Sequence, residues 1–208
     1  MTMDVQNILK DILDNLDRMD HIRPEDVPGI DLYMDQVTTF MDRQLQASKR
    51  YEDDKILTKT MINNYAKNNL LPPPEKKKYS KEHLLLLIFI YYFKNILSIS
   101  DIHSLFAPLT EKYFHTGHAI QLEQIYDEVF SLEKAQIETL KEDLRSKYQI
   151  AGETFKDASS EDKDFLELFS FICMLSLDVY MKKHVIEKLI DQLPEPEKKG
   201  KKKGAESQ

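Results

Sequence analysis

Apolar residues recur along this chain at the spacing of an α-helix. Side chains three or four positions apart lie on one face of a helix, so the pattern predicts helices that each pack through one side. No long stretch alternates apolar and polar residues as a half-buried strand does. The pattern therefore predicts an all-α fold. The expected helices cover about residues 3–19, 30–47, 59–68, 81–96, 99–107, 119–149 and 161–193.

Capping and breaking residues mark the ends of several of these helices. Thr58, Ser80 and Ser98 stand just before apolar segments, where a hydroxyl oxygen can accept a hydrogen bond from a free N–H of the first turn. Asn69 is expected to end the helix at 59–68, because asparagine tolerates the left-handed backbone of a C′ residue. Pro108 is expected to end the helix that begins at residue 99.

The helix at 81–96 is the most apolar of the set. Leu84 to Phe93 form an apolar run of ten residues, with Lys81 before it and Lys94 after it. A membrane-spanning helix needs about 20 such residues, so the run predicts a core helix that is covered on more than one side. The first residues lack the basic start and apolar run of a secretory signal. A single cysteine cannot form an internal disulfide. We therefore expect a cytoplasmic protein.

Charge is distributed unevenly along the chain. The net charge is −7, which disfavours a protein that coats nucleic acid over its whole surface. Between Lys55 and His83, however, seven lysines accompany two glutamates, a local net charge of +5. Such a basic island is typical of a phosphate-binding surface. Five glycines are few for a chain with a phosphate-cradling loop. No nucleophile, metal or carboxylate-pair motif is found, so we expect neither catalysis nor a cofactor.

The basic island has the layout of a winged helix-turn-helix. A short helix with a polar exposed side precedes a lysine-rich connector at 72–80, which starts with three prolines. In that layout the short helix enters the major groove of DNA and the wing follows the phosphate backbone. Asparagine can make two hydrogen bonds to adenine, and lysines release counterions from phosphates. The predicted DNA-binding residues are Thr58, Lys59, Asn63, Asn64, Tyr65, Lys67, Lys76, Lys77, Lys78 and Tyr79.

The order of residues in this stretch resembles the MerR-type DNA-binding domain. That family has a T-L-R-Y-Y-E helix, a G-L-L-P-P turn and a basic wing that ends in R-Y-S. Asn63, Asn64 and Asn69 stand here in place of the family's arginine, first tyrosine and turn glycine. Residues 30–107 are also similar to an uncharacterised bacterial family labelled a domain of unknown function, numbered 1836. The residues that match the MerR-type pattern are Thr58, Ile62, Tyr65, Leu70, Leu71, Pro72, Pro73, Tyr79, Ser80, Leu84, Ile90, Ser98 and Ile102.

The MerR-type resemblance implies a transcriptional regulator that binds double-stranded DNA. It implies a homodimer through the long helix at 119–149 and a helical effector module after residue 150. The expected organisation is an N-terminal helix with its linker, a winged helix-turn-helix domain, a C-terminal helical domain and a disordered basic tail. These units correspond to residues 1–29, 30–107, 108–193 and 194–208.

The same features have plainer interpretations. The lysines of the wing can be a solvated loop, and Tyr65 and Tyr79 can serve packing alone. The apolar stripe of 119–149 changes register between Leu132 and Ile137. Such a shift weakens a long coiled coil, so the stripe can equally be a seam within one chain.

Three other residues have similarly plain readings, and one alternative function remains open. His115 and His118 have metal-like spacing but no third ligand nearby, which favours a polar loop. Cys173 lies on an apolar helix face and is expected to be inert. The alternative function is a helical protein–protein interaction adaptor that has a winged-helix fold and does not bind DNA.

Overall fold

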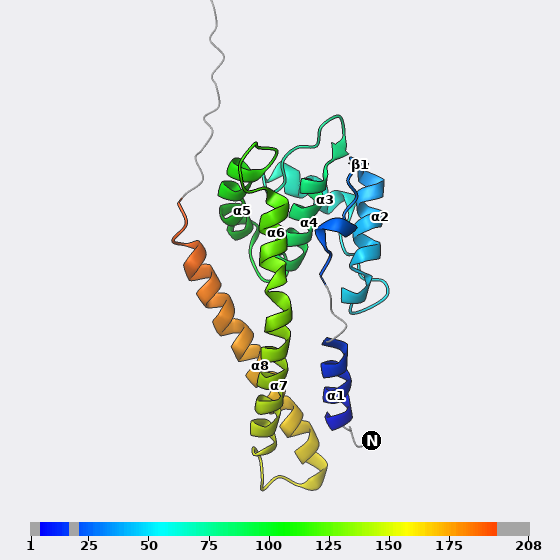
Figure 1. The fold of residues 1–208 in the computed structure, drawn as a ribbon. Helices are drawn as coiled ribbons and strands as arrows, with labels where there is room; N and C mark the ends of the chain where they lie inside the picture. The colour runs from blue at the N-terminus through cyan, green and yellow to red at the C-terminus, as the bar shows by residue number, and fades with distance from the viewer. Residues whose placement is uncertain (1–4, 17–20, 195–208) are drawn as a thin grey trace, which may run out of the picture.

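The computed structural model describes residues 5–16 and 21–194 and consists mainly of helices (Figure 1). This confirms a predominantly α-helical fold. The predicted basic tail lies outside the described residues. Across these ranges, every helix is either too short or too polar to span a lipid bilayer. The elements are α1 (Val5–Leu16), β1 (Leu32–Tyr33), α2 (Met34–Gln44), α3 (Lys59–Lys67), β2 (Lys78–Tyr79), α4 (Lys81–Phe93), α5 (Ile99–Tyr113), α6 (Leu122–Ser131), α7 (Glu133–Gly152) and α8 (Ser160–Ile190).

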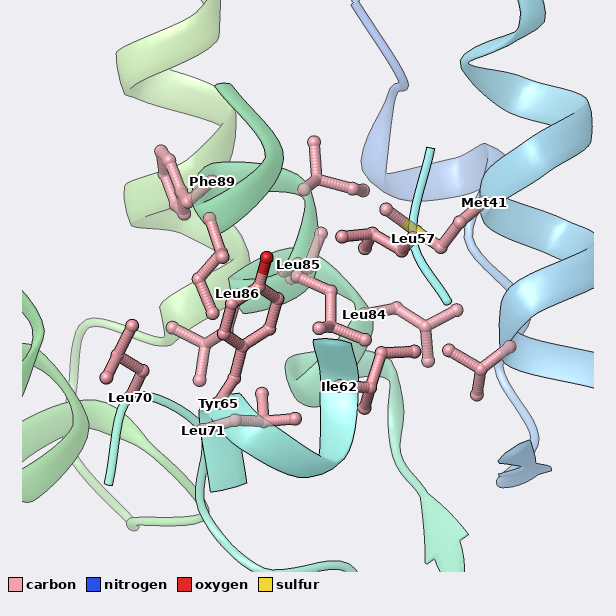
Figure 2. Packing of buried hydrophobic residues seen from close by; sticks show 14 of the residues in the cluster. Met41, Leu57, Ile62, Tyr65, Leu70, Leu71, Leu84, Leu85, Leu86 and Phe89 are labelled. Carbon is pink, nitrogen blue, oxygen red and sulfur yellow. The ribbon is translucent and has the colours of Figure 1, made fainter. Parts of the chain in front are cut away.

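Helix α4 lies at the centre of the main hydrophobic core. Its residues from Leu84 to Ile90 are at most 5% exposed, which confirms that this helix is covered on several sides. Figure 2 shows side chains of α3 and of the segments around it packed against α4. On another side, the Phe89 ring lies 5.2 Å from both the Tyr126 ring and the Phe130 ring of α6. The apolar run therefore organises the residues around it into one core.

Two short strands were not expected from the sequence. β1 pairs with β2 in an antiparallel register, with Leu32 opposite Tyr79 and Tyr33 opposite Lys78. Strands of two residues are too short to show periodic alternation. The pairing ties the segment before α2 to the segment before α4.

Two helix boundaries differ from the prediction. Helix α5 continues through Pro108 to Tyr113, although proline removes one hydrogen bond of the helix ladder. Leu105 and Leu109 on either side pack against the main core, and this burial holds the helix together. The long helix expected at 119–149 is interrupted at Leu132, between α6 and α7. The interruption falls where the apolar stripe changes register.

A second, smaller hydrophobic cluster joins α1 to the last two helices. Leu9 and Leu13 of α1 pack with Leu144 and Ala151 of α7 and with Phe171 of α8. Helices α7 and α8 form an antiparallel hairpin that extends away from the α2–α6 region, and α1 lies beside its lower part (Figure 1). Near its C-terminal end, α8 returns to the main core through Ile190.

Candidate nucleic-acid interface

Both ends of α3 are fixed by local hydrogen bonds. Thr58 caps its start, because the Met61 N–H donates to Thr58 Oγ1 at 3.2 Å, as predicted. At the other end Asn69 has a φ of 56°. The N–H groups of Asn69 and Leu70 donate to the carbonyls of Ala66 and Tyr65. These two bonds form a Schellman motif, so the predicted role of Asn69 as the C′ residue is confirmed.

One side of α3 is buried and the other faces solvent. Ile62 and Tyr65 pack into the main core beside α4 (Figure 2). The exposed side carries Lys59, Asn63, Asn64 and Lys67, while Thr58 is half-buried. Within the described chain, no hydrogen bond engages the side-chain amides of Asn63 and Asn64. The helix therefore presents two cations and two free amides from a rigidly held backbone.

The wing is a tight hairpin turn with two lysines at its tip. Glu75 and Lys78 form a β-bridge, and the Lys78 N–H donates to the Glu75 carbonyl at 2.8 Å. Between them, Lys76 and Lys77 have φ values of 46° and 64°. Two consecutive positive φ values are the pattern of a type I′ turn, where asparagine and glycine are preferred. Both lysine side chains are exposed at the tip.

The base of the wing is anchored to the core. Tyr79 is buried, and the Lys78 ammonium group lies 5.3 Å from the centre of the Tyr33 ring across the strand pair. Burial raises the pKa of both Tyr65 and Tyr79. These two tyrosines, predicted as DNA contacts, are in packed positions, which fits their plainer interpretation. The exposed members of the predicted set are Lys59, Asn63, Asn64, Lys67, Lys76 and Lys77, and Lys78 is half-buried.

A polar network behind the wing was not anticipated from the sequence. The Ser80 N–H donates to His83 Nδ1 at 3.0 Å, and Ser80 Oγ lies 2.9 Å from His115 Nε2. The His115 N–H donates to Glu82 Oε2 at 2.7 Å. The network thus fastens the loop after α5 to the start of α4. The capping position of Ser80 was predicted, but its link to His115 spans too many residues for a local pattern to reveal.

His83 is the one buried histidine of this network. Burial lowers its pKa to about 4, and the nearby carbonyls of Pro73 and Pro72 offset only part of that effect. Because Nδ1 accepts from Ser80, the proton of the neutral ring is on Nε2. His83 Nε2 is fully covered and makes no hydrogen bond of normal geometry within the described residues. His83 therefore acts as a neutral packing and capping residue at the base of the wing.

The lysines in and around the candidate interface differ in whether they form ion pairs within the chain. Lys59 forms an ion pair with Asp35 of α2, and Lys81 pairs with Glu123 at 2.8 Å. Lys67, Lys76 and Lys77 form no ion pair with any residue that the structure describes. The free positive charge is therefore concentrated on the end of α3 and the tip of the wing.

The link between α2 and α3 is longer than a tight helix-turn-helix turn. Fourteen residues, 45–58, separate the two helices and include a short 3₁₀ turn at 46–48. A typical turn of that motif has three or four residues. Ile56 and Leu57 in this link are buried in the main core, so the extra length packs against the protein. Helices α2 and α3 still contact each other.

The comparison with family models identifies the central part of the chain. Residues 22–129, just over half of the sequence, match the family described as Domain of unknown function (DUF1836). The chain belongs to this family. No curated protein and no solved structure matches it. The resemblance of the DUF1836 region to MerR-type domains stays a prediction.

The DUF1836 region coincides with the main core of the molecule. Near its start, the Ile22 carbonyl accepts a hydrogen bond of 2.6 Å from the hydroxyl of Tyr126, which lies near its end. The region includes α3, the wing and α4, and leaves out α1, α7 and α8. The candidate interface therefore lies within the region that matches the DUF1836 family.

Two residues with metal-like spacing are not gathered into a metal site. His115 bonds to Ser80, and the His118 ring lies edge-on to the Tyr113 ring at 5.0 Å. Over residues 5–16 and 21–194, no group of three or more His, Cys, Asp or Glu side chains is arranged to hold a metal ion. Cys173 is half-buried on α8.

Proposed function

We propose that this DUF1836 protein is a DNA-binding transcriptional regulator that acts in the cytoplasm. In this proposal α3 enters the major groove, where Asn63 and Asn64 contact base edges and Lys67 contacts phosphate. The wing tip lies along the phosphate backbone and contributes the positive charges of Lys76 and Lys77.

The observation that carries the proposal is the conformation of the wing tip. Left-handed backbone costs about 1–2 kcal/mol for an ordinary residue, and Lys76 and Lys77 adopt it side by side. Such local strain is concentrated at functional sites. Two exposed lysines without ion-pair partners among the described residues, held on a tight hairpin, suit a contact with closely spaced phosphates.

The position of α3 supports the same proposal. Its buried residues hold it against α4, so little backbone entropy remains to be lost when it docks. Its outward side chains are the amides and cations that duplex recognition uses. The wing pairs with β1 immediately before α2, which makes α2, α3 and the wing parts of one rigid surface.

The test is a binding titration followed by fluorescence anisotropy. Genomic duplexes selected by the protein from a fragment library would serve as probes, at salt concentrations between about 50 and 200 mM. The wild type should bind with an affinity that falls steeply as salt rises. The Lys76→Ala/Lys77→Ala variant should reduce the slope of log K against log salt by about two, because each lost phosphate contact contributes about 0.9.

A matched control separates the wing from net charge. Lys112 and Lys156 are exposed lysines outside the candidate interface, and Lys112→Ala/Lys156→Ala removes the same total charge. This control should keep the wild-type slope. Equal slopes for the two double variants, or no salt-dependent binding to any duplex, would overturn the proposal.

The second candidate is a protein–protein interaction adaptor that does not bind DNA. The observation in its favour is the ion pair between Lys59 and Asp35, which already neutralises the first cation of α3. An adaptor would fail the anisotropy titration and would bind one protein partner through the same surface. The predicted homodimer through residues 119–149 belongs to the regulator proposal. In that segment Leu122 and Leu144 are buried within the chain, whereas Val129 and Leu132 remain exposed.

A further inference from the structure

Helix α8 carries more exposed apolar surface than any other helix described. Ten of its large apolar side chains are more than a third exposed, which corresponds to roughly 800–1,000 Å² of apolar surface at about 80–100 Å² each. The ten residues are Phe165, Phe169, Ile172, Leu177, Val179, Tyr180, Met181, Val185, Ile186 and Leu189.

Part of this surface forms a continuous seam along one side of the helix. Phe165, Phe169, Ile172, Ser176 and Val179 follow one another at intervals of four and three residues, which is the spacing of a coiled-coil interface. We call these five residues, together with the adjoining Tyr180, the α8 seam. Its five apolar members are 51–69% exposed, and Ser176 is also exposed.

The opposite side of α8 is already used within the chain. Phe171 is buried in the second cluster, where Met174 and Leu175 also pack. Farther along, the helix stands apart from α6 and α7 before it reaches the main core (Figure 1). The seam is therefore left without a partner among the described residues, while the opposite side of the helix is packed around Phe171 and the helix is anchored again at Ile190.

The charges of α8 indicate which partner fits. Residues 161–167 hold four acidic side chains and one lysine, a net charge of −3, whereas residues 182–188 hold three lysines and one glutamate, a net charge of +2. A second α8 that lies antiparallel brings each acidic end beside a basic end. A parallel pair would place like charges together, which is unfavourable.

From these observations, we propose that two copies of the chain pair through their α8 seams in antiparallel orientation. The two-fold axis lies between Ile172 and Ser176, near the middle of the seam that runs from Phe165 to Tyr180, and the small serine side chain allows close approach there. The apolar seams of two copies bury about 1,000 Å², the lower limit of a specific interface. This surface differs from the stripe at 119–149 and does not depend on DNA binding.

The first test measures the mass of the full-length protein in solution by sedimentation equilibrium. The wild type should be a dimer at micromolar concentration. Phe169→Glu/Ile172→Glu should raise the dimer Kd at least 100-fold, because it introduces charges at the centre of the seam. A far-UV circular dichroism spectrum should stay unchanged, since both side chains are exposed in the single chain.

Val185 offers a matched control on the same helix. It is 57% exposed, and thirteen residues after Ile172 it points to the other side of the helix. Val185→Glu should leave the dimer intact. A monomeric wild type would overturn the proposal, and so would an equal loss of dimer in the Val185→Glu variant.

The second test reports the orientation of the pair without weakening the seam. In a Cys173→Ser background, a cysteine introduced by Ser176→Cys should cross-link two copies under mild oxidation. A cysteine introduced by Lys183→Cys, seven residues later on the same side of the helix, should not, because in the antiparallel pair the two sites lie about 27 Å apart at 1.5 Å per residue. Cross-linking at both positions would indicate a parallel pair, and cross-linking at neither would exclude contact through this face.

Discussion

Lys76 and Lys77 hold a backbone conformation that lysine does not favour. The unfolded chain has no such strain, so the left-handed backbone of the wing tip lowers the stability of the folded protein, and such strain is found mainly where function requires it. The two neighbouring positive charges at the tip repel each other, which lowers the stability of the folded chain further. Stability and function therefore make opposite demands on these two residues.

Replacing the two lysines by the preferred turn residues should reveal this conflict. Lys76→Asn/Lys77→Gly should raise the free energy of unfolding by about 1 kcal/mol, since the added entropy of glycine in the unfolded chain offsets part of the relieved strain. Urea unfolding would measure the change. The Lys76→Ala/Lys77→Ala control removes the same charges without relieving the backbone and should gain less. A less stable Asn–Gly variant would show that the tip is not strained.

His83 should make stability depend on pH in a defined range. Its pKa is about 4 in the folded chain and near 6.5 in the unfolded chain. Between these values the unfolded chain binds a proton that the folded chain does not, so stability is full above pH 6.5 and falls towards pH 4. The total loss is up to about 3 kcal/mol.

His83→Gln isolates this effect, because glutamine at the third helical position can still accept the Ser80 N–H. Urea unfolding at pH 7, 6 and 5 should give a shallower decline for the variant than for the wild type. His184→Gln, a change at an exposed position, should keep the wild-type decline. If stability declined equally with pH in the wild type and in His83→Gln, His83 would bind a proton as readily in the folded chain as in the unfolded chain.

At the scale of elements, the sequence predicted those features that local chemistry determines. The caps Thr58 and Ser98 and the C′ residue Asn69 were predictable because each satisfies backbone groups within a few residues. Helix α4 was predictable because its apolar residues run all round the surface. The predicted end of α5 at Pro108 was wrong, because contacts from distant elements outweigh a single lost hydrogen bond there.

The candidate site was predictable in part for the same reason. The exposed amides and lysines of α3 follow from helical periodicity, and the burial of Tyr65 follows from it equally. The pairing of β1 with β2 and the bond between Ser80 and His115 join segments far apart in the sequence. The left-handed backbone of Lys76 and Lys77 has no signal in the residue types, because lysine is not enriched in such turns.

At the scale of the whole molecule, two hydrophobic clusters stabilise different parts of the protein. The main cluster contains α4 and both parts of the candidate interface, and the smaller one joins α1 to the α7–α8 hairpin. The apolar stripe changes register at Leu132, where α6 gives way to α7. Local opening of the hairpin should therefore leave the main core intact.

Phe171→Ala tests this division because Phe171 is a buried member of the smaller cluster only. Truncation of a buried phenylalanine costs about 3–5 kcal/mol, so amide hydrogen exchange should accelerate strongly in α1 and in the hairpin. Amides of α4 should keep their wild-type protection. Leu86→Ala, which opens a cavity in the main cluster, should instead accelerate exchange in α3, α4 and the wing together. Equal acceleration of α4 in both variants would mean that the two clusters unfold as one unit, and any change at the α8 seam would then be transmitted to the candidate interface.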